Sequence, residues 1–312
     1  MTTELLASIV CTAAVLAAEP PAATPEARAV AFLAREVPRW AVQNECYSCH
    51  NNGDAARALY RAAELNFDFD RAALADTTEW LAHPERWKDN GGEGEFSDKK
   101  LADVQFAAAL AEAVRTGAAK ERTPLLRAAE LVAARQDADG SWIIQPDAAL
   151  GSPATWGRTL ATVISRQTLA AADAKRFAAA IRRADGWLRK REPQTVFEAA
   201  ALLLLPEDVA TKEQREASLS LVHRGEDAGG GWGPYVTSAP EPFDTALVLL
   251  ALAPRASDAE IRPVVRRGRA YLAQTQLEDG SWPETTRPAG AESYAQRIST
   301  TGWATLALLA TK

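Results

Sequence analysis

Apolar residues recur every three or four positions through most of the chain, in segments separated by short loops rich in Gly, Pro and Asp. This spacing predicts amphipathic α-helices. In three places a helical segment, a loop and a second helical segment follow one another, at residues 125–166, 215–252 and 266–310. The pattern therefore predicts helical hairpins that repeat along the chain.

The loops of these three hairpins share a motif that ends in tryptophan. Residues 136–142 read Gln-Asp-Ala-Asp-Gly-Ser-Trp, residues 276–282 read Gln-Leu-Glu-Asp-Gly-Ser-Trp, and a glycine-rich variant ends at Trp232. One degenerate copy of the hairpin fits between Trp142 and Trp232, at residues 184–205. Two weaker copies lie upstream of Trp142, at residues 26–65 and 77–114. The sequence thus predicts about six hairpins.

A helical hairpin cannot bury its apolar face alone, so repeated hairpins stack. Ala and Leu dominate the composition and β-branched runs are scarce, which favours helix over sheet. We predict an all-α fold in which about six hairpins close into a ring with an inner and an outer helix layer, an α/α toroid. Residues 26–312 would form this single domain.

The Gln-x-x-Asp-Gly-Ser-Trp loops resemble those of the squalene–hopene cyclase and protein prenyltransferase superfamily. The match is good at residues 127–164 and 260–311, and fair at 212–253. The resemblance implies the same toroid. Asp-Gly favours a tight turn and Trp is suited to packing between hairpins, so we expect the motif to hold the ring together rather than to perform chemistry.

The resemblance also implies chemistries whose residues are missing. Cyclases of this family protonate their substrate with an Asp-x-Asp-Asp cluster and use two helical domains, and prenyltransferases bind zinc through Asp, Cys and His. The chain has no such acidic cluster: Asp68-Phe69-Asp70 and Asp137-Ala138-Asp139 fall in loops, and no cysteine follows Cys49. We therefore leave open whether the protein is an enzyme.

Two acidic residues each open the second helix of a repeat, Glu198 and Asp244. They could meet at one mouth of the ring. We favour helix capping and dipole stabilisation for both. Arg158 of another repeat could pair with one of them, which would make the group a salt-bridge network.

The motif that points to chemistry is Cys46-Tyr47-Ser48-Cys49-His50. This is the C-x-x-C-H attachment motif of c-type haem: two thiols bond covalently to one porphyrin, and the following histidine ligates iron. Only Cys11 lies outside the motif among three cysteines, and the chain has only three histidines. These five residues resemble c-type cytochromes, and they predict one covalent haem c with His50 as an axial iron ligand.

The sixth iron ligand is open. Met1 is the only methionine, so a Met/His pair is not expected. The candidates are His83, which we favour over His223, or no protein ligand. Aromatic side chains of Tyr47, Trp80 and Trp87 could pack around the porphyrin or between repeats. A disulfide, a redox dithiol, a zinc site or a plain turn are the alternative uses of the motif.

The chain begins with an apolar segment, residues 5–18, followed by a Pro/Ala-rich stretch. The segment is too short to span a bilayer and suits a secretory signal, so we predict a cleaved signal peptide at 1–18, a linker at 19–25 and a periplasmic or otherwise exported protein. We do not expect an integral membrane protein. The net charge of −6 disfavours nucleic acid.

Three functions remain at this point. The first is an exported haem protein that transfers electrons to a redox partner protein or binds a small molecule. The second is a non-catalytic toroid that binds a hydrophobic or peptide ligand, with a Cys46–Cys49 disulfide. The third is an isoprenoid-converting enzyme, which rests on fold analogy. The sequence does not give the oligomeric state.

Overall fold

The structure, a computed structural model, describes residues 23–90, 99–145, 147, 150–285, 287 and 293–312. The predicted signal peptide and most of the predicted linker lie outside the described residues. Within them no helix is long and apolar enough to cross a membrane.

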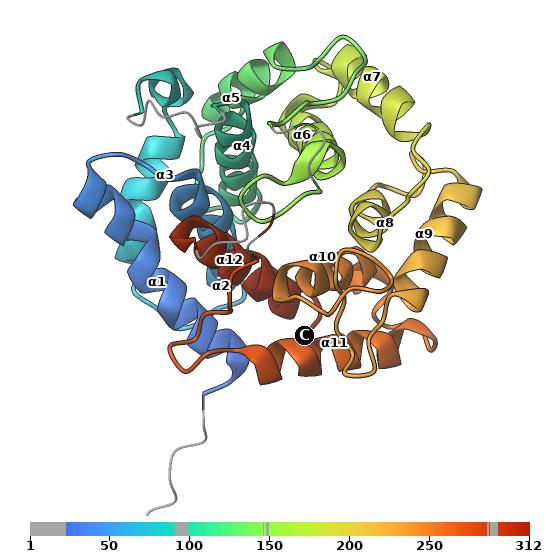
Figure 1. Ribbon diagram of the computed structural model, residues 1–312. Helices are drawn as coiled ribbons and strands as arrows, with labels where there is room; N and C mark the ends of the chain where they lie inside the picture. Colours follow the sequence, from blue (N-terminus) through green and yellow to red (C-terminus); the bar gives the residue numbers. More distant parts are fainter. Residues whose placement is uncertain (1–22, 91–98, 146, 148–149, 286, 288–292) are drawn as a thin grey trace, which may run out of the picture.

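The described helices form two concentric layers (Figure 1). The outer layer consists of α1 (Pro25–Asn44), α3 (Ala75–Leu81), α5 (Thr123–Ala134), α7 (Ala178–Leu188), α9 (Lys212–Arg224) and α11 (Ile261–Thr275). The inner layer consists of α2 (Ala56–Glu64), α4 (Lys99–Arg115), α6 (Gly157–Asp173), α8 (Val196–Leu203), α10 (Pro242–Leu252) and α12 (Tyr294–Ala310). Short helical turns precede or connect some of them: η1 (Cys49–Ala55), η2 (Arg71–Leu74), η3 (Pro84–Asp89) and η4 (Ala253–Arg255). The predicted all-α toroid of six hairpins is confirmed.

The layers follow from the apolar pattern. The inner helices α10 and α12 are buried on nearly every side, with small or hydroxyl-bearing residues among their apolar ones, whereas an outer helix such as α11 buries a single stripe. A helix that is apolar all round must be surrounded by other elements, and a one-sided helix can face water.

The tryptophan loops join each hairpin to its own outer helix and to the next hairpin. The indole Nε1 of Trp142 donates to the carbonyl of Val132, ten residues earlier, at 2.8 Å. The Gln136 side chain donates to the carbonyl of Ala180 in the next outer helix at 2.9 Å. These contacts confirm the structural role expected for the motif.

The last loop makes the same contacts with the first helix, and this closes the ring. Gln276 donates to the carbonyl of Pro25 at 2.9 Å, as Gln136 does to Ala180. Gly280 has a φ of +94°, and a Cβ there would lie 2.4 Å from the carbonyl oxygen of Arg28. The junction between the sixth and first hairpins therefore repeats the junction between the third and fourth.

Replacing Gly280 by Ala is expected to weaken this junction. The substitution forces an L side chain into a left-handed backbone and against the Arg28 carbonyl, so the free energy of unfolding should fall by about 1–3 kcal/mol. Gly186→Ala is the matched control, because Gly186 lies inside α7 and a Cβ there meets nothing within 4 Å. In urea unfolding, the free energy of unfolding of Gly186→Ala should rise by about 0.5–1 kcal/mol. Equal changes for the two variants would contradict a close contact between Gly280 and Arg28.

Candidate functional site

The Cys-x-x-Cys-His motif lies at the turn between α1 and the inner layer of the first hairpin. Ser48 is extended, and its hydroxyl accepts from the backbone N–H of His50 at 3.2 Å and of Asn51 at 3.4 Å. This cap starts η1, a π-helical turn that runs into α2. The motif thus occupies the loop position that the tryptophan motif occupies in other repeats.

Two buried asparagines anchor η1 to its neighbours. Asn51 donates to the carbonyl of Glu36 in α1 at 2.8 Å and to the hydroxyl of Tyr294 in α12 at 2.9 Å. Asn52 donates to the hydroxyl of Thr77 in α3 at 2.8 Å. Three helices from three hairpins therefore fix the backbone of the motif.

No disulfide joins the two cysteines of the motif, and the residues Cys46 and Cys49 are each partly exposed. Cys49 also packs against the apolar core of the ring. The two cysteines lie on either side of Ser48, at the point where the extended chain enters η1. Both cysteines therefore carry thiols at the start of η1.

The imidazole of His50 is held by one contact from the last helix. Its Nδ1 lies 3.0 Å from the hydroxyl oxygen of Ser299 in α12. Burial lowers the pKa of His50 to about 4, so the ring is neutral near pH 7. With a proton on Nδ1 donated to Ser299, Nε2 carries the lone pair that can ligate a metal.

The aromatic residues near the motif pack against one another and against the second hairpin. Tyr47 stacks on Trp80 of that hairpin with ring centroids 4.3 Å apart, and its hydroxyl donates to Asp76 at 2.8 Å. Trp87 packs on Phe106 within the second hairpin, with centroids 5.4 Å apart. Of the two roles considered for these side chains, the structure shows packing, and the Tyr47–Trp80 stack is the part of it that joins two hairpins.

The structure does not bring the other two histidines to the motif. His83 bonds through Nδ1 to Glu85 at 2.9 Å and through Nε2 to Glu79 at 3.0 Å. These carboxylates raise the pKa of His83, which favours its protonated form. His223 is exposed on α9, across the ring from α1 (Figure 1). His83 as sixth ligand therefore loses support, because ligation would require breaking a bond to a carboxylate.

Four residues after His50, the carboxyl of Asp54 is fully buried in the inner layer. One oxygen, Oδ2, accepts from Gln105 Nε2 at 2.9 Å and from Trp156 Nε1 at 3.2 Å. The guanidinium of Arg57 lies 3.8 Å from the other oxygen. Burial raises the pKa of Asp54 to about 6, against the opposing effect of Arg57, Ser299 and the two indoles of Trp156 and Trp303.

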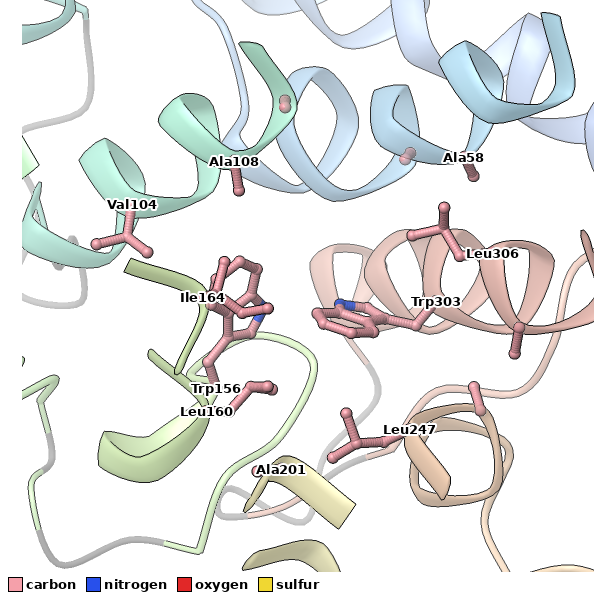
Figure 2. Packing of buried hydrophobic residues seen from close by; sticks show 14 of the residues in the cluster. Ala58, Val104, Ala108, Trp156, Leu160, Ile164, Ala201, Leu247, Trp303 and Leu306 are labelled. Carbon is pink, nitrogen blue, oxygen red and sulfur yellow. The ribbon is translucent and has the colours of Figure 1, made fainter. Parts of the chain in front are cut away.

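Aromatic side chains fill the middle of the ring beside this carboxyl. Trp156, in the loop before α6, and Trp303, in α12, meet edge to face with ring centroids 5.6 Å apart (Figure 2). Both are fully buried. Trp156 has a φ of +56°, a conformation unfavourable for a bulky side chain, so its packing must hold it there. Arg57 stacks over Trp303 at 4.9 Å.

The acidic residues singled out from sequence behave differently from one another. Glu198 accepts from the backbone N–H of Gln194 at 2.9 Å, which is a capping role as expected. Asp244 is buried and pairs with Arg287 at 2.8 Å, and burial raises its pKa to about 7. Arg158 pairs with neither acid: its ion pairs are with Asp139 of its own tryptophan loop and with Asp147.

Among the described residues, no three His, Cys, Asp or Glu side chains converge as a metal-binding cluster. A cavity of about 850 Å³ lies between the ends of α2 and α4, and His83 lines it.

Comparison with solved structures shows the same fold. The chain is similar to the type II terpene cyclase MstE from Scytonema in its apo form, with 15% identity, a TM-score of 0.56, and coverage of 91% of this chain and 96% of the other. It is also similar to the R337A variant of that enzyme in complex with geranylgeranyl dihydroxybenzoate, with 14% identity, a TM-score of 0.54, and coverage of 92% and 98%. No protein-family model and no curated protein matches the chain.

The comparison corrects one argument from the sequence. We expected cyclases to carry two helical domains and treated the single domain of this chain as evidence against that chemistry. The matched terpene cyclase chain is covered almost completely by this one toroid. Domain number therefore does not separate this protein from cyclases, and at 15% identity the likeness establishes the fold alone.

Four residues of the site were missed at the sequence level: Asn51, Asn52, Asp54 and Ser299. A polar run, Asn-Asn-Gly-Asp, opens the first inner segment directly after His50. That run was the available signal for three of them. Ser299 could not be assigned, because its role depends on ring closure.

The raised pKa of Asp244 predicts a pH-dependent stability. The folded protein holds this proton at pH values where the unfolded chain has lost it, so the contribution is full below pH 4, declines as pH rises, and is lost above about pH 7. Between pH 4.5 and 8, wild type should lose roughly 2–4 kcal/mol of unfolding free energy relative to Asp244→Asn. Urea unfolding measures this, with exposed Asp208→Asn as the control. A constant difference between wild type and Asp244→Asn would refute the assignment.

Proposed function

We propose that this protein is an exported c-type haem protein built on a terpene-cyclase-like toroid. Haem would be attached through Cys46 and Cys49, with His50 as an axial iron ligand. The observation that carries the proposal is the position of His50: its Nδ1 lies 3.0 Å from the hydroxyl oxygen of Ser299, and it directly follows a Cys-x-x-Cys pair that forms no disulfide.

The donor set fits the group. Each S–H adds across one vinyl group, forming a carbon–sulfur bond while the hydrogen goes to the other vinyl carbon, so no oxidant is needed. His50 needs no deprotonation to bind iron near pH 7. Ser299 acts as the outer partner that orients a ligating histidine, and such partners fix the tautomer and ring direction.

When bound, haem supplies either a one-electron redox centre or an open iron site for a small molecule. Both ring nitrogens of His83 bond to glutamates, which supports a haem iron without a second histidine ligand. We therefore expect an iron whose sixth position is open or filled by a weak ligand. The buried asparagines keep η1 in place, which limits movement of His50 between oxidation states.

The test is expression with an export signal in cells that mature cytochromes c, followed by pyridine haemochrome and reduced-minus-oxidised spectra. Wild type should carry one haem per chain. Cys46→Ser with Cys49→Ser should lose covalent haem, since both thioether bonds are gone. His50→Ala should change or abolish the ferrous spectrum.

His83→Ala is the matched control, and its spectrum should equal that of wild type. A changed spectrum would restore His83 as the sixth ligand. Haem-free wild type with a Cys46–Cys49 disulfide would overturn the proposal and favour the ligand-binding toroid instead.

A second candidate is acid-catalysed cyclisation of an isoprenoid, as the similarity to a type II terpene cyclase suggests. The observation that favours it is a buried carboxyl, Asp54, whose pKa burial raises to about 6, next to the indoles of Trp156 and Trp303. Such a carboxyl can hold a proton near neutral pH, and aromatic faces stabilise cations. Two features oppose it: Oδ2 of Asp54 accepts from two donors, and the two indoles occupy the middle of the ring.

Incubation with geranylgeranyl dihydroxybenzoate and with squalene, followed by mass-resolved chromatography, tests this candidate. We expect no cyclised product. A product made by wild type and absent with Asp54→Asn would establish cyclase activity at this carboxyl.

A further inference from the structure

A pocket in the last part of the ring is bordered by arginines of the outer helix α11. It has a volume of about 510 Å³ and lies between α11, the loop that follows α10 and the end of α12. Figure 1 shows the C-terminus at this place, between α11 and the inner helices α10 and α12. The pocket is separate from the Cys-x-x-Cys-His motif, which lies at the turn after α1.

Three arginines of α11 line this pocket, Arg262, Arg266 and Arg269. They stand at positions i, i+4 and i+7 of the helix, so they share one of its faces. Arg267 lies on a different face and pairs with Glu226 of the neighbouring hairpin at 2.6 Å. The arginines at the pocket are therefore not needed for that contact between hairpins.

Two of the three guanidinium groups have no carboxylate partner in the part of the chain that the structure describes. Arg269 pairs with Glu26 of α1 at 2.5 Å. Arg262 donates to a backbone carbonyl, that of Ser257, at 2.5 Å, and Arg266 bonds to none of the described residues. Arg262 and Arg266 are both exposed, so a ligand from solvent can reach them.

The walls of the pocket add no negative charge. None of the described residues that line it is Asp or Glu, and small or apolar side chains such as those of Ala256 and Ala310 form much of the wall. In a chain with a net charge of −6, the pocket is a local concentration of positive charge. Like charges four residues apart on a helix repel each other, so an anion between Arg262 and Arg266 would relieve an unfavourable interaction.

We propose that this pocket binds a phosphate group, carried by a small phosphate monoester or by the head group of a lipid. A guanidinium offers paired N–H donors that match two phosphate oxygens. Side chains at i and i+4 lie about 5–6 Å apart, so Arg262 and Arg266 can hold one phosphate between them. A phosphate monoester carries about 1.5–2 negative charges at pH 7, which matches two unpaired arginines, whereas a carboxylate carries one.

Isothermal titration of the whole protein with glycerol 3-phosphate is the first measurement, with acetate as the singly charged comparison. Wild type should bind the phosphate ester more tightly than acetate. The double variant Arg262→Ala with Arg266→Ala should weaken binding of the ester by about tenfold or more, since charge-assisted hydrogen bonds are lost. Arg266→Lys keeps the charge and loses the paired donors, so it should weaken binding by less.

Arg182→Ala is the matched control. Arg182 is an exposed arginine inside another outer helix, α7, and it does not line the pocket. Its loss changes the net charge by the same amount as the loss of one pocket arginine, so affinity for glycerol 3-phosphate should stay at the wild-type value. Circular dichroism should show wild-type helix content for every variant, because the replaced side chains are exposed.

Sedimentation with vesicles distinguishes the two sources of the phosphate. Vesicles of phosphatidylcholine that contain phosphatidic acid present the same phosphate monoester at a surface, and phosphatidylcholine alone is the comparison. Binding of free glycerol 3-phosphate assigns the pocket to a soluble ester, and binding to the phosphatidic acid vesicles alone assigns it to a lipid head group. In either case the double variant should lose binding and Arg182→Ala should keep it.

The opposite results overturn the inference. These are binding of neither probe, equal binding by wild type and the double variant, or acetate bound as tightly as the ester. An equal loss in Arg182→Ala and in the double variant would show attraction to net charge and would overturn it as well. Haem attachment has no part in these measurements, so their outcome is independent of the proposed function.

Discussion

Closure of the ring is the constraint on which the rest of this structure depends. Each hairpin buries only part of its apolar surface against the hairpin before it, so the first and last hairpins must cover each other. Gln276 and Gly280 make that junction with α1 by the same contacts that other repeats use. Closure also places α12 against η1, and this brings Ser299 to His50 and Tyr294 to Asn51.

Helices from three hairpins therefore surround the Cys-x-x-Cys-His motif, and a short isolated loop would lack these contacts. The side-chain amides of Asn51 and Asn52 bond η1 to α1, α3 and α12, and burial desolvates the imidazole of His50. Residues that lie more than 200 positions apart in the chain set the orientation of one side chain. A toroid of this kind can thus hold a side chain such as that of His50 in a fixed orientation at a loop between its outer and inner helices.

Much of this fold could be predicted from sequence, because helical periodicity and a recurrent tryptophan loop are local signals. Gln136 and Gln276 have the joining role that their spacing suggested. The π-helical turn at Cys49–Ala55 could not be predicted, since it depends on a close approach of Gly302 from the other end of the chain. The surroundings of His83 could not be predicted either. Its expected place on the same loop face of the neighbouring hairpin suggested ligation, and in the structure Glu79 and Glu85 bond to its ring nitrogens.

The central claim is that Cys46 and Cys49 carry haem. It is tested most directly by the mass of the tryptic peptide that spans residues 40–57, taken from protein exported by cells with cytochrome c maturation. The account predicts that this peptide carries the mass of one haem and absorbs visible light. A haem-free peptide, with its two thiols either reduced or joined in a disulfide, would contradict it.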